Sequence, residues 1–213
     1  MLQFVSMLHE KQRFPMVIPL LAAAAIGIAV VCHPWDLNIS LGAQQTKIPG
    51  DLRKAIHLSE TFAHASGCIM IFGALLWIDI PNRKPLWRAA AFVALCGIAA
   101  NAAKYFIPRY RPHSLGESET PITTAWETWG VPGTGSWFDE QIRSFPSGHS
   151  ATAVALAIGL TQVYPRGRWI FASMAAMACL QRLVSGAHYL SDILGGVLIT
   201  LVLSLWYWKA TSG

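Results

Sequence analysis

The sequence predicts an all-α membrane protein: a polytopic helical bundle with about six transmembrane helices, forming a single domain over residues 1–213. The amino-acid composition supports this prediction. Hydrophobic residues make up 54% of the chain and charged residues only 13%, whereas a soluble domain has roughly 25% charged residues. The apolar residues form long segments without strand-like alternation, and only helices and closed barrels can span a bilayer.

Six segments have the composition of membrane helices, which need about 20 mainly apolar residues. They cover residues 16–35, 61–80, 87–106, 147–164, 169–183 and 191–208. A cleaved signal peptide is an alternative for the first, because Lys11 and Arg13 precede it. The segment is long and no clear cleavage site follows it, so we expect it to form a helix of the bundle.

Tryptophans support these boundaries, because aromatic residues concentrate at both membrane interfaces. Six lie at or near segment ends: Trp35, Trp77, Trp87, Trp169, Trp206 and Trp208. Three others, Trp126, Trp129 and Trp137, fall in the long loop before the fourth segment. They belong either to a small soluble core or to a surface that rests on the membrane, and the sequence leaves both possibilities open.

Basic residues in the short loops predict the orientation. The residues outside the first and last segments and in the two short loops are Lys11, Arg13, Arg83, Lys84, Arg88, Arg166, Arg168 and Lys209. Alternating helices place all of them on one side, which the positive-inside rule makes cytoplasmic, together with both termini. The opposite side also carries basic residues, so the short loops alone support this orientation. The net charge of +5 therefore favours anionic lipid or phosphate as the binding partner, and we expect no nucleic-acid partner.

Three polar clusters, residues 104–112, 143–150 and 182–192, fall on the non-cytoplasmic side. Ionisable groups at the ends of apolar helices are costly and therefore candidates for function. In the second cluster, Ser147, Gly148 and His149 follow Pro146 and open a helix. A helix N-terminus binds anions, and glycine permits close approach of an oxyanion to the backbone. The alternative is an ordinary helix start with an interfacial histidine.

In the third cluster, His188 and Asp192 are four residues apart. On a helix they share one face. A carboxylate on one ring nitrogen fixes the tautomer of the imidazole and leaves the other nitrogen free as a nucleophile or base. The alternative is an interfacial histidine beside an aspartate that caps a helix.

Lys104, Arg111 and Arg182 supply positive charge suited to phosphate oxygens. Each one alone is also explained by reaching to lipid headgroups. Their convergence with two histidines and a carboxylate on one side favours a phosphate site. Arg109 and Arg143 lie within the clusters and His113 directly follows the first one, but all three stay outside the predicted core of the site. They either extend its positive mouth or lie at the membrane interface.

The three clusters together resemble the three-part signature of the type 2 phosphatidic acid phosphatase superfamily, the lipid phosphate phosphatases. Its first part is Lys, six residues, then Arg-Pro, matched by Lys104 and Arg111-Pro112. The second is Pro-Ser-Gly-His, matched by residues 146–149. The third is Ser-Arg, five residues, His, three residues, Asp. Arg182, His188 and Asp192 match it, with Gln181 in place of Ser.

This resemblance implies an integral membrane phosphatase that hydrolyses a lipid phosphomonoester or pyrophosphate through a phosphohistidine intermediate. His188 is then the nucleophile, Asp192 orients it, and His149 protonates the leaving alkoxide. The phosphate oxygens are held by Lys104, Arg111, Ser147, Gly148 and Arg182. The resemblance implies no cofactor and no metal. Phosphatidic acid, phosphatidylglycerol phosphate, polyprenyl pyrophosphate and lipid A phosphate all remain open as substrates.

Two other functions compete with this interpretation. Vanadium-dependent haloperoxidases resemble the same signature, but they are soluble. A membrane transporter or binding protein with a residual site is the second, and the intact His149, His188 and Asp192 argue against it. We also expect Gly195 and Gly196 to let helices approach closely near the site.

Overall fold

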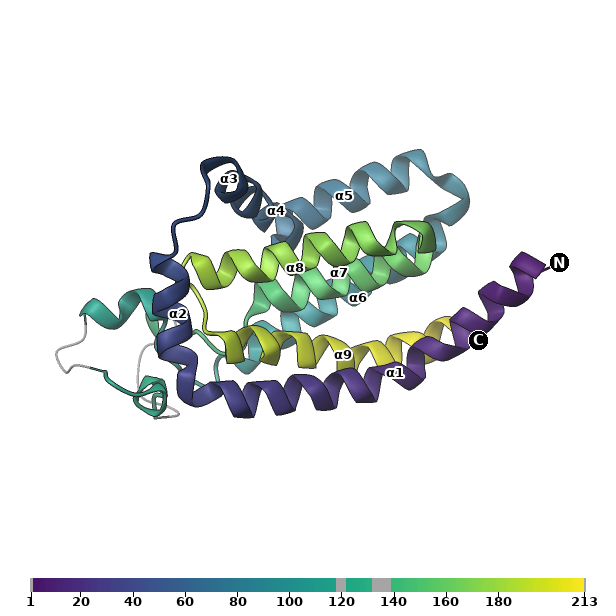
Figure 1. Cartoon of the computed structure of the whole chain (residues 1–213). Coiled ribbons are helices and arrows are strands. Elements are labelled where there is room, and N and C mark those ends of the chain that lie inside the picture. The colour runs from purple at the N-terminus through teal and green to yellow at the C-terminus, as the bar shows by residue number, and fades with distance from the viewer. Residues whose placement is uncertain (1, 118–121, 132–138, 213) are drawn as a thin grey trace.

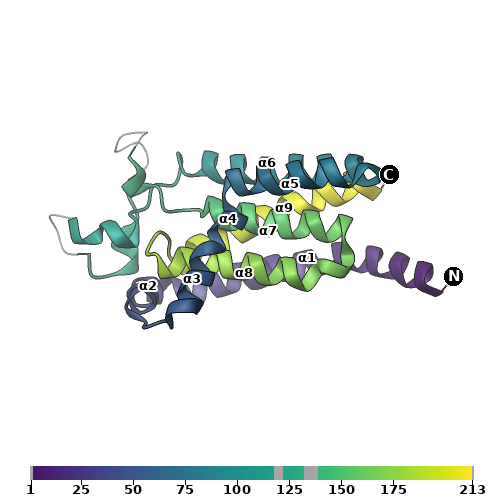
Figure 2. The same ribbon diagram turned by 90° about the horizontal axis from the view of Figure 1, so that it is seen from above.

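The computed structural model of the chain describes residues 2–117, 122–131 and 139–212. Its long helices lie roughly alongside one another in a bundle (Figures 1 and 2). The helices are α1 (Leu2–Cys32), α2 (Asp36–Gln45), α3 (Gly50–Leu58), α4 (Glu60–Ala63), α5 (Ala65–Ile78), α6 (Arg83–Ala103), α7 (Gly148–Val163), α8 (Arg168–Val184) and α9 (Leu190–Ser212). The all-α prediction is confirmed for the described residues.

The predicted count of six membrane spans is not confirmed. Length and composition identify three described segments that can cross a membrane: Val17–Gln45, Ile80–Ala103 and Leu190–Lys209. A fourth is added if the bent pair Gly50–Ala63 and Ala65–Ile78 counts as one span. Helices α7 and α8 have only 16 and 17 residues, fewer than the roughly 20 that a span needs.

The predicted continuous helix over residues 61–80 is wrong, because the chain bends by 72° between α4 and α5. His64 sits at the break with an extended backbone, φ −90° and ψ 145°. The first turn of α5 then packs against the backbone of α4. A Cβ atom on Gly67 would lie 1.8 Å from the carbonyl oxygen of Thr61, so only glycine fits there.

Helix α7 forms the centre of the bundle, packed against α6, α8 and α9, while α1 packs on α9. Small residues make this close packing possible, and Ala151, Ala153 and Ala155 are fully buried. The expectation of close helix approach is confirmed for Gly196, which lies against the start of α7, whereas Gly195 lies against the Phe145 ring before α7. Cβ atoms at these positions would lie 2.6 Å from the Phe145 ring and 2.3 Å from the Ser147 carbonyl oxygen, respectively.

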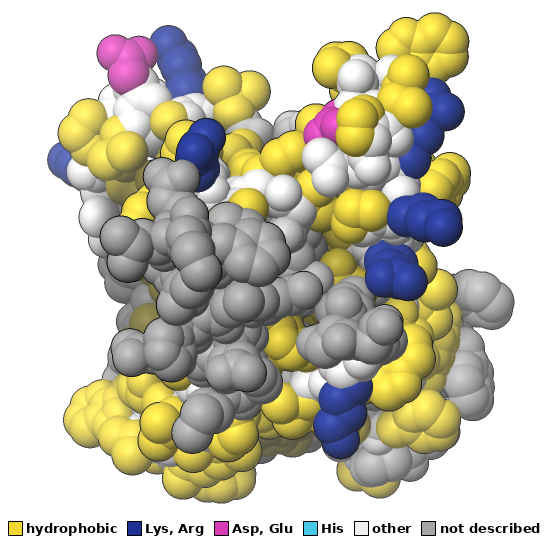
Figure 3. Space-filling view, turned by 90° about the vertical axis from the view of Figure 1, so that its right-hand side faces the viewer, with side chains coloured by type: hydrophobic (Ala, Val, Ile, Leu, Met, Phe, Trp, Pro, Cys, Tyr) yellow, Lys and Arg dark blue, Asp and Glu magenta, His cyan; other side chains and the backbone are white. Residues whose placement is uncertain are grey.

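The two ends of the bundle differ in character. The turns from α5 to α6 and from α7 to α8 share one end (Figure 1), where Lys and Arg side chains are exposed (Figure 3). Helices α2 and α3, the segment that follows α6 and the loop between α8 and α9 lie at the other end (Figure 1). Trp77, Trp87 and Trp169 are among the most exposed large side chains of the turn-bearing end, as a membrane interface requires.

Candidate active site

The eight predicted site residues all lie at the end of the bundle opposite the short basic turns. Lys104 directly follows α6, and Arg111 lies in the extended segment after it. Ser147, Gly148 and His149 begin α7, and Arg182 is in the last turn of α8. His188 precedes α9, and Asp192 is in the first turn of α9. The starts of α7 and α9 are tied together, because the Ser147 N–H donates to the Asp192 carbonyl oxygen at 2.9 Å. Three stretches that are distant in sequence, residues 104–111, 147–149 and 182–192, thus meet at one place.

His188 is buried and faces the Asp192 carboxylate. Its Nδ1 lies 3.7 Å from Oδ2 of Asp192, which is longer than a hydrogen bond. Catalytic hydrogen bonds often tighten only when substrate is bound. Burial lowers the pKa of His188 to about 4, with Asp192 acting in the opposite direction and Lys104 and Arg111 adding to the lowering. The imidazole is therefore neutral at pH 7, as a nucleophile must be.

The Asp192 carboxylate is held on both oxygens. Its Oδ1 accepts a hydrogen bond from Arg109 Nη1 at 2.5 Å. Its Oδ2 accepts from Ser144 Oγ at 2.5 Å and from the Tyr189 N–H at 2.9 Å. Asp192 is thus a fixed and fully buried acceptor, and the carboxylate cannot rotate away from His188 without breaking these bonds.

The suggestion that Arg109 extends a positive mouth, or lies at the interface, is wrong. Its side chain is fully buried and ion-paired with Asp36 and Asp192. His113 is exposed, and its Nδ1 is 3.1 Å from the Gly186 carbonyl oxygen. The Arg143 guanidinium stacks on the Tyr105 ring at 4.5 Å. Sequence alone offered the same two alternatives for these three residues, but the structure places them in three different environments.

The loop tryptophans that the structure describes also differ in burial and in their contacts. Trp129 is half-buried and its Nε1 donates to His33 Nε2 at 2.8 Å, so it belongs to the packed interior of this end. Trp126 contacts His33 with the two rings tilted by 49° and their centroids 4.3 Å apart, but it remains 68% exposed. Trp137 lies outside the described residues.

The start of α7 is built as an anion site. Ser147 is the N-cap, and its Oγ accepts from the Ser150 N–H at 3.3 Å. The first N–H groups of a helix have no partner within it, and together with the helix dipole they attract anions. A Cβ at Gly148 would lie 3.1 Å from Oδ1 of Asn101, so glycine here lets α7 begin close against α6.

Two cations border this site from the α6 side. Lys104 and Arg111 line the same cavity as Gly148 and His149. Burial, with the neighbouring Arg111 charge, lowers the pKa of Lys104 to about 8. Burial likewise lowers the pKa of Arg111. A phosphate dianion bound between them would favour the charged form of both groups.

Arg182 is oriented by two residues that carry no local sequence signal for this role. Its Nη2 lies 2.7 Å from Oε1 of Glu60, and its Nε donates to Oε1 of Gln181. Gln181 Nε2 in turn donates to Glu60 Oε2 at 3.1 Å. Gln181, the one departure from the family signature, thus joins Arg182 to Glu60 in α4.

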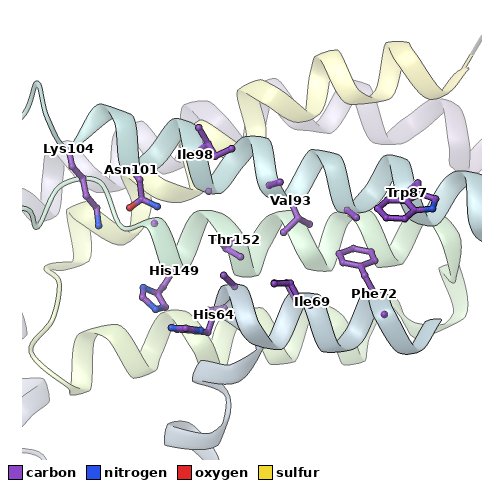
Figure 4. A pocket seen from close by; sticks show the side chains of 18 of the residues that line it. His64, Ile69, Phe72, Trp87, Val93, Ile98, Asn101, Lys104, His149 and Thr152 are labelled. Carbon is purple, nitrogen blue, oxygen red and sulfur yellow. The ribbon is translucent and has the colours of Figure 1, made fainter. Parts of the chain in front are cut away.

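A groove of about 700 Å³ leads away from the cationic end of the site. Its walls come from α5, α6 and α7 and are mostly apolar, with Ile69, Phe72, Trp87, Val93 and Ile98 along its length (Figure 4). His64 and His149 lie beside each other at its polar end (Figure 4), with ring centroids 5.8 Å apart. The groove therefore joins a cationic end to a long apolar part.

Sequence reasoning missed four groups of this end: Asp36, Glu60, His64 and Ser144. Arg109 was noticed but placed outside the core. No local pattern separated it from Arg111, which lies two residues later in the chain. Asp36 and Glu60 reach the site only through long-range packing, which no local pattern encodes.

Comparison with known proteins places this geometry in context. The sequence model of the PAP2 superfamily matches residues 85–213. A lipid A 1-phosphatase from Rhizobium etli is 34% identical over 109 residues, which cover 49% of this chain and 41% of that protein. A lipid A 1-phosphatase from Rhizobium johnstonii is 32% identical over 108 residues, covering 49% and 39%. The chain thus matches less than half the length of these curated relatives.

Two crystal structures share the fold. Aquifex aeolicus LpxE is 19% identical, with a TM-score of 0.55, over 82% of this chain and 95% of that one. The transmembrane PAP2-type phosphatidylglycerolphosphate phosphatase from Bacillus subtilis is 21% identical, with a TM-score of 0.56, over 92% of each chain. Both confirm a membrane-embedded helical bundle as the fold class.

Proposed function

Because the chain belongs to the PAP2 superfamily, we propose that it is an integral membrane phosphatase that hydrolyses a lipid phosphomonoester or pyrophosphate. One observation carries the proposal: Lys104, Arg111 and His149 lie at one end of a groove whose remaining walls are apolar. A phosphate bound by the cations would have its lipid tail in the groove. Exposed apolar side chains on α5 and α6, such as Ile69 and Ile98, open that wall to the bilayer.

The proposed reaction has two steps. The neutral His188 attacks phosphorus, so a P–N bond forms while the P–O bond to the lipid breaks. His149, which enters this step protonated, gives its proton to the leaving oxygen and is left neutral, ready to act as a base. The negative charge of the bound phosphate favours the protonated form of His149. Water, deprotonated by His149, then attacks the phosphohistidine and releases phosphate. Lys104, Arg111, Arg182 and the N-terminus of α7 neutralise the phosphoryl oxygens, which is the main requirement of phosphoryl transfer.

The similarity to two lipid A 1-phosphatases and to a phosphatidylglycerolphosphate phosphatase supports a lipid substrate. It does not choose among phosphate-bearing lipids. The phosphate-binding groups are cations and helix N–H groups, while the buried carboxylates Asp36 and Asp192 are engaged by Arg109. We propose that catalysis needs no metal and no cofactor.

The test is phosphate release by the purified chain in detergent, measured across phosphatidic acid, phosphatidylglycerol phosphate, polyprenyl pyrophosphate and lipid A. We expect hydrolysis of at least one lipid, undiminished by excess EDTA and inhibited by vanadate, which mimics phosphate. Hydrolysis of none would disprove the proposed function. Loss of activity in chelator with recovery on adding Mg²⁺ would contradict the metal-independent mechanism.

We further propose that the site faces the extracytoplasmic side of the cell membrane, with both termini cytoplasmic. The exposed Arg83, Lys84 and Arg166 lie at the end opposite the site, and the positive-inside rule makes that end cytoplasmic. A cysteine replacing the exposed Ser185 should react with an impermeant maleimide in intact cells. An Arg166→Cys variant should react only after permeabilisation, and the unsubstituted chain measures the background of its four cysteines. The reverse pattern would overturn the orientation.

A further inference from the structure

Arg109 lies behind the catalytic pair, in the interior of the protein. Arg109, Asp36 and Asp192 are all 0% exposed. The guanidinium bridges the two carboxylates, with Nη2 2.9 Å from Oδ2 of Asp36 and Nη1 2.5 Å from Oδ1 of Asp192. One cation thus joins the start of α2 to the first turn of α9.

Two further hydrogen bonds engage this guanidinium. Nη1 donates to Ser191 Oγ at 2.7 Å, and Nε donates to Thr128 Oγ1 at 3.0 Å. An arginine has five N–H donors, and four hydrogen bonds are formed here. The side chain is buried and does not line the groove. Arg109 is therefore not available to bind a phosphate.

Two aromatic rings fix the plane of the guanidinium. Its central carbon lies 4.3 Å from the ring centroid of Trp129 and 4.1 Å from that of Tyr189. Contacts of a guanidinium with aromatic faces are attractive. Rotation of Arg109 would break these stacks as well as its hydrogen bonds, so the side chain is rigid before substrate arrives.

The backbone of Arg109 holds the other oxygen of the same carboxylate. The Ser144 N–H donates to the Arg109 carbonyl oxygen at 2.9 Å, and Ser144 Oγ donates to Asp192 Oδ2 at 2.5 Å. Arg109 therefore positions Oδ1 directly and Oδ2 through Ser144. Oδ2 is the oxygen that faces Nδ1 of His188.

Asp36 holds the same helix end from the other side. Its Oδ1 accepts from the Ser191 N–H at 3.1 Å, and its Oδ2 accepts from Ser191 Oγ. Asp36 thus caps α9 with a side chain from a distant helix. The residue that carries the catalytic carboxylate is fixed in both position and angle.

We propose that Arg109, anchored by Asp36, is a positioning residue for the Asp192–His188 pair, which holds the carboxylate so that the imidazole presents its other nitrogen to phosphorus. The inference rests on the proposed function. Kinetics distinguish this role from phosphate binding by Arg109. Loss of a group that acts through Asp192 slows the chemical step and leaves the affinity for phosphate unchanged.

The experiment compares Arg109→Lys with Arg111→Lys, two arginines on the same extended segment. Lysine keeps the charge but lacks the planar fork that bonds both carboxylates. We expect Arg109→Lys to lower kcat and the rate of phosphoenzyme formation by about 10²-fold, the cost of a small misplacement of a catalytic group. Its KM and its affinity for vanadate should stay unchanged. Arg111→Lys, at the groove, should instead weaken vanadate binding and raise KM.

A double-substitution cycle tests whether Arg109 acts through Asp192. The Arg109→Lys, Asp192→Asn double variant should be no slower than Asp192→Asn alone, because residues that act as one unit are not additive. Additive losses would overturn the inference, and so would an Arg109→Lys variant with normal kcat or with raised KM alone.

The substitution Asp36→Asn covers the case in which Arg109→Lys does not fold. Asparagine has the shape of aspartate, so the helix end keeps its packing while Arg109 loses one ionic anchor. We expect a smaller loss of kcat at unchanged KM, and a normal kcat would overturn the inference. An unsubstituted chain without phosphatase activity would disprove the proposed function and this inference with it, whereas an active chain insensitive to these changes would overturn the inference alone.

Discussion

Replacing His188 by alanine should reduce turnover to the background of the assay and abolish the acid-labile phosphoenzyme. His188 is the only group for which the proposed mechanism has no substitute, because its nitrogen forms the covalent bond to phosphorus. The variant should still bind vanadate non-covalently, since Lys104, Arg111 and the start of α7 remain.

Rapid-quench trapping of the phosphoenzyme is the measurement. His113→Ala is the matched control, because His113 is an exposed histidine at the same end of the bundle whose ring contacts a backbone carbonyl; it should keep nearly full activity. A phosphohistidine that survives in His188→Ala but is missing from His149→Ala would reverse the assignment of the two histidines.

Replacing His149 by alanine should slow hydrolysis of a lipid phosphate by about 10²–10⁴-fold, the usual contribution of a positioned proton donor. His149 lies in the first turn of α7 and lines the groove where the lipid would leave. The nucleophile and its carboxylate remain in this variant, so phosphoenzyme should still form, only more slowly.

The leaving group provides the diagnostic measurement for His149. The p-nitrophenolate ion needs little protonation, so the loss measured with p-nitrophenyl phosphate should be much smaller than the loss with a lipid alcohol. Equal losses with both substrates would show that His149 acts by some means other than proton donation. His113→Ala again serves as the control and should show no dependence on the leaving group.

The sequence by itself determined the fold class and the set of residues to examine. Long apolar segments require helices in a membrane, because unpaired backbone groups in lipid are too costly. The spacing from Lys104 to Asp192 placed each charged residue at the end of an apolar segment. Helix starts are locally encoded, and the N-cap at Ser147 was predictable from the Pro-Ser-Gly-His sequence.

The sequence did not determine the number of spans or the break in the second predicted helix. Residues 61–80 have continuous helical composition, and at the bend Gly67 lies so close to the Thr61 backbone that no larger residue fits there. Such a bend depends on which elements surround it. Composition alone cannot distinguish a straight helix from two short ones that place Glu60 and His64 at the site.

Only the tertiary structure decided which charges face the groove and which are paired in the interior. Arg109 and Arg111 have the same side chain and are two residues apart. One is enclosed between Asp36 and Asp192, and the other lines the groove. The physical reason is that burial and pairing of a charge are set by groups that arrive from distant helices. Asp36, far from Arg109 in sequence, pairs with this buried cation and stabilises it, while Arg111 lines the open groove.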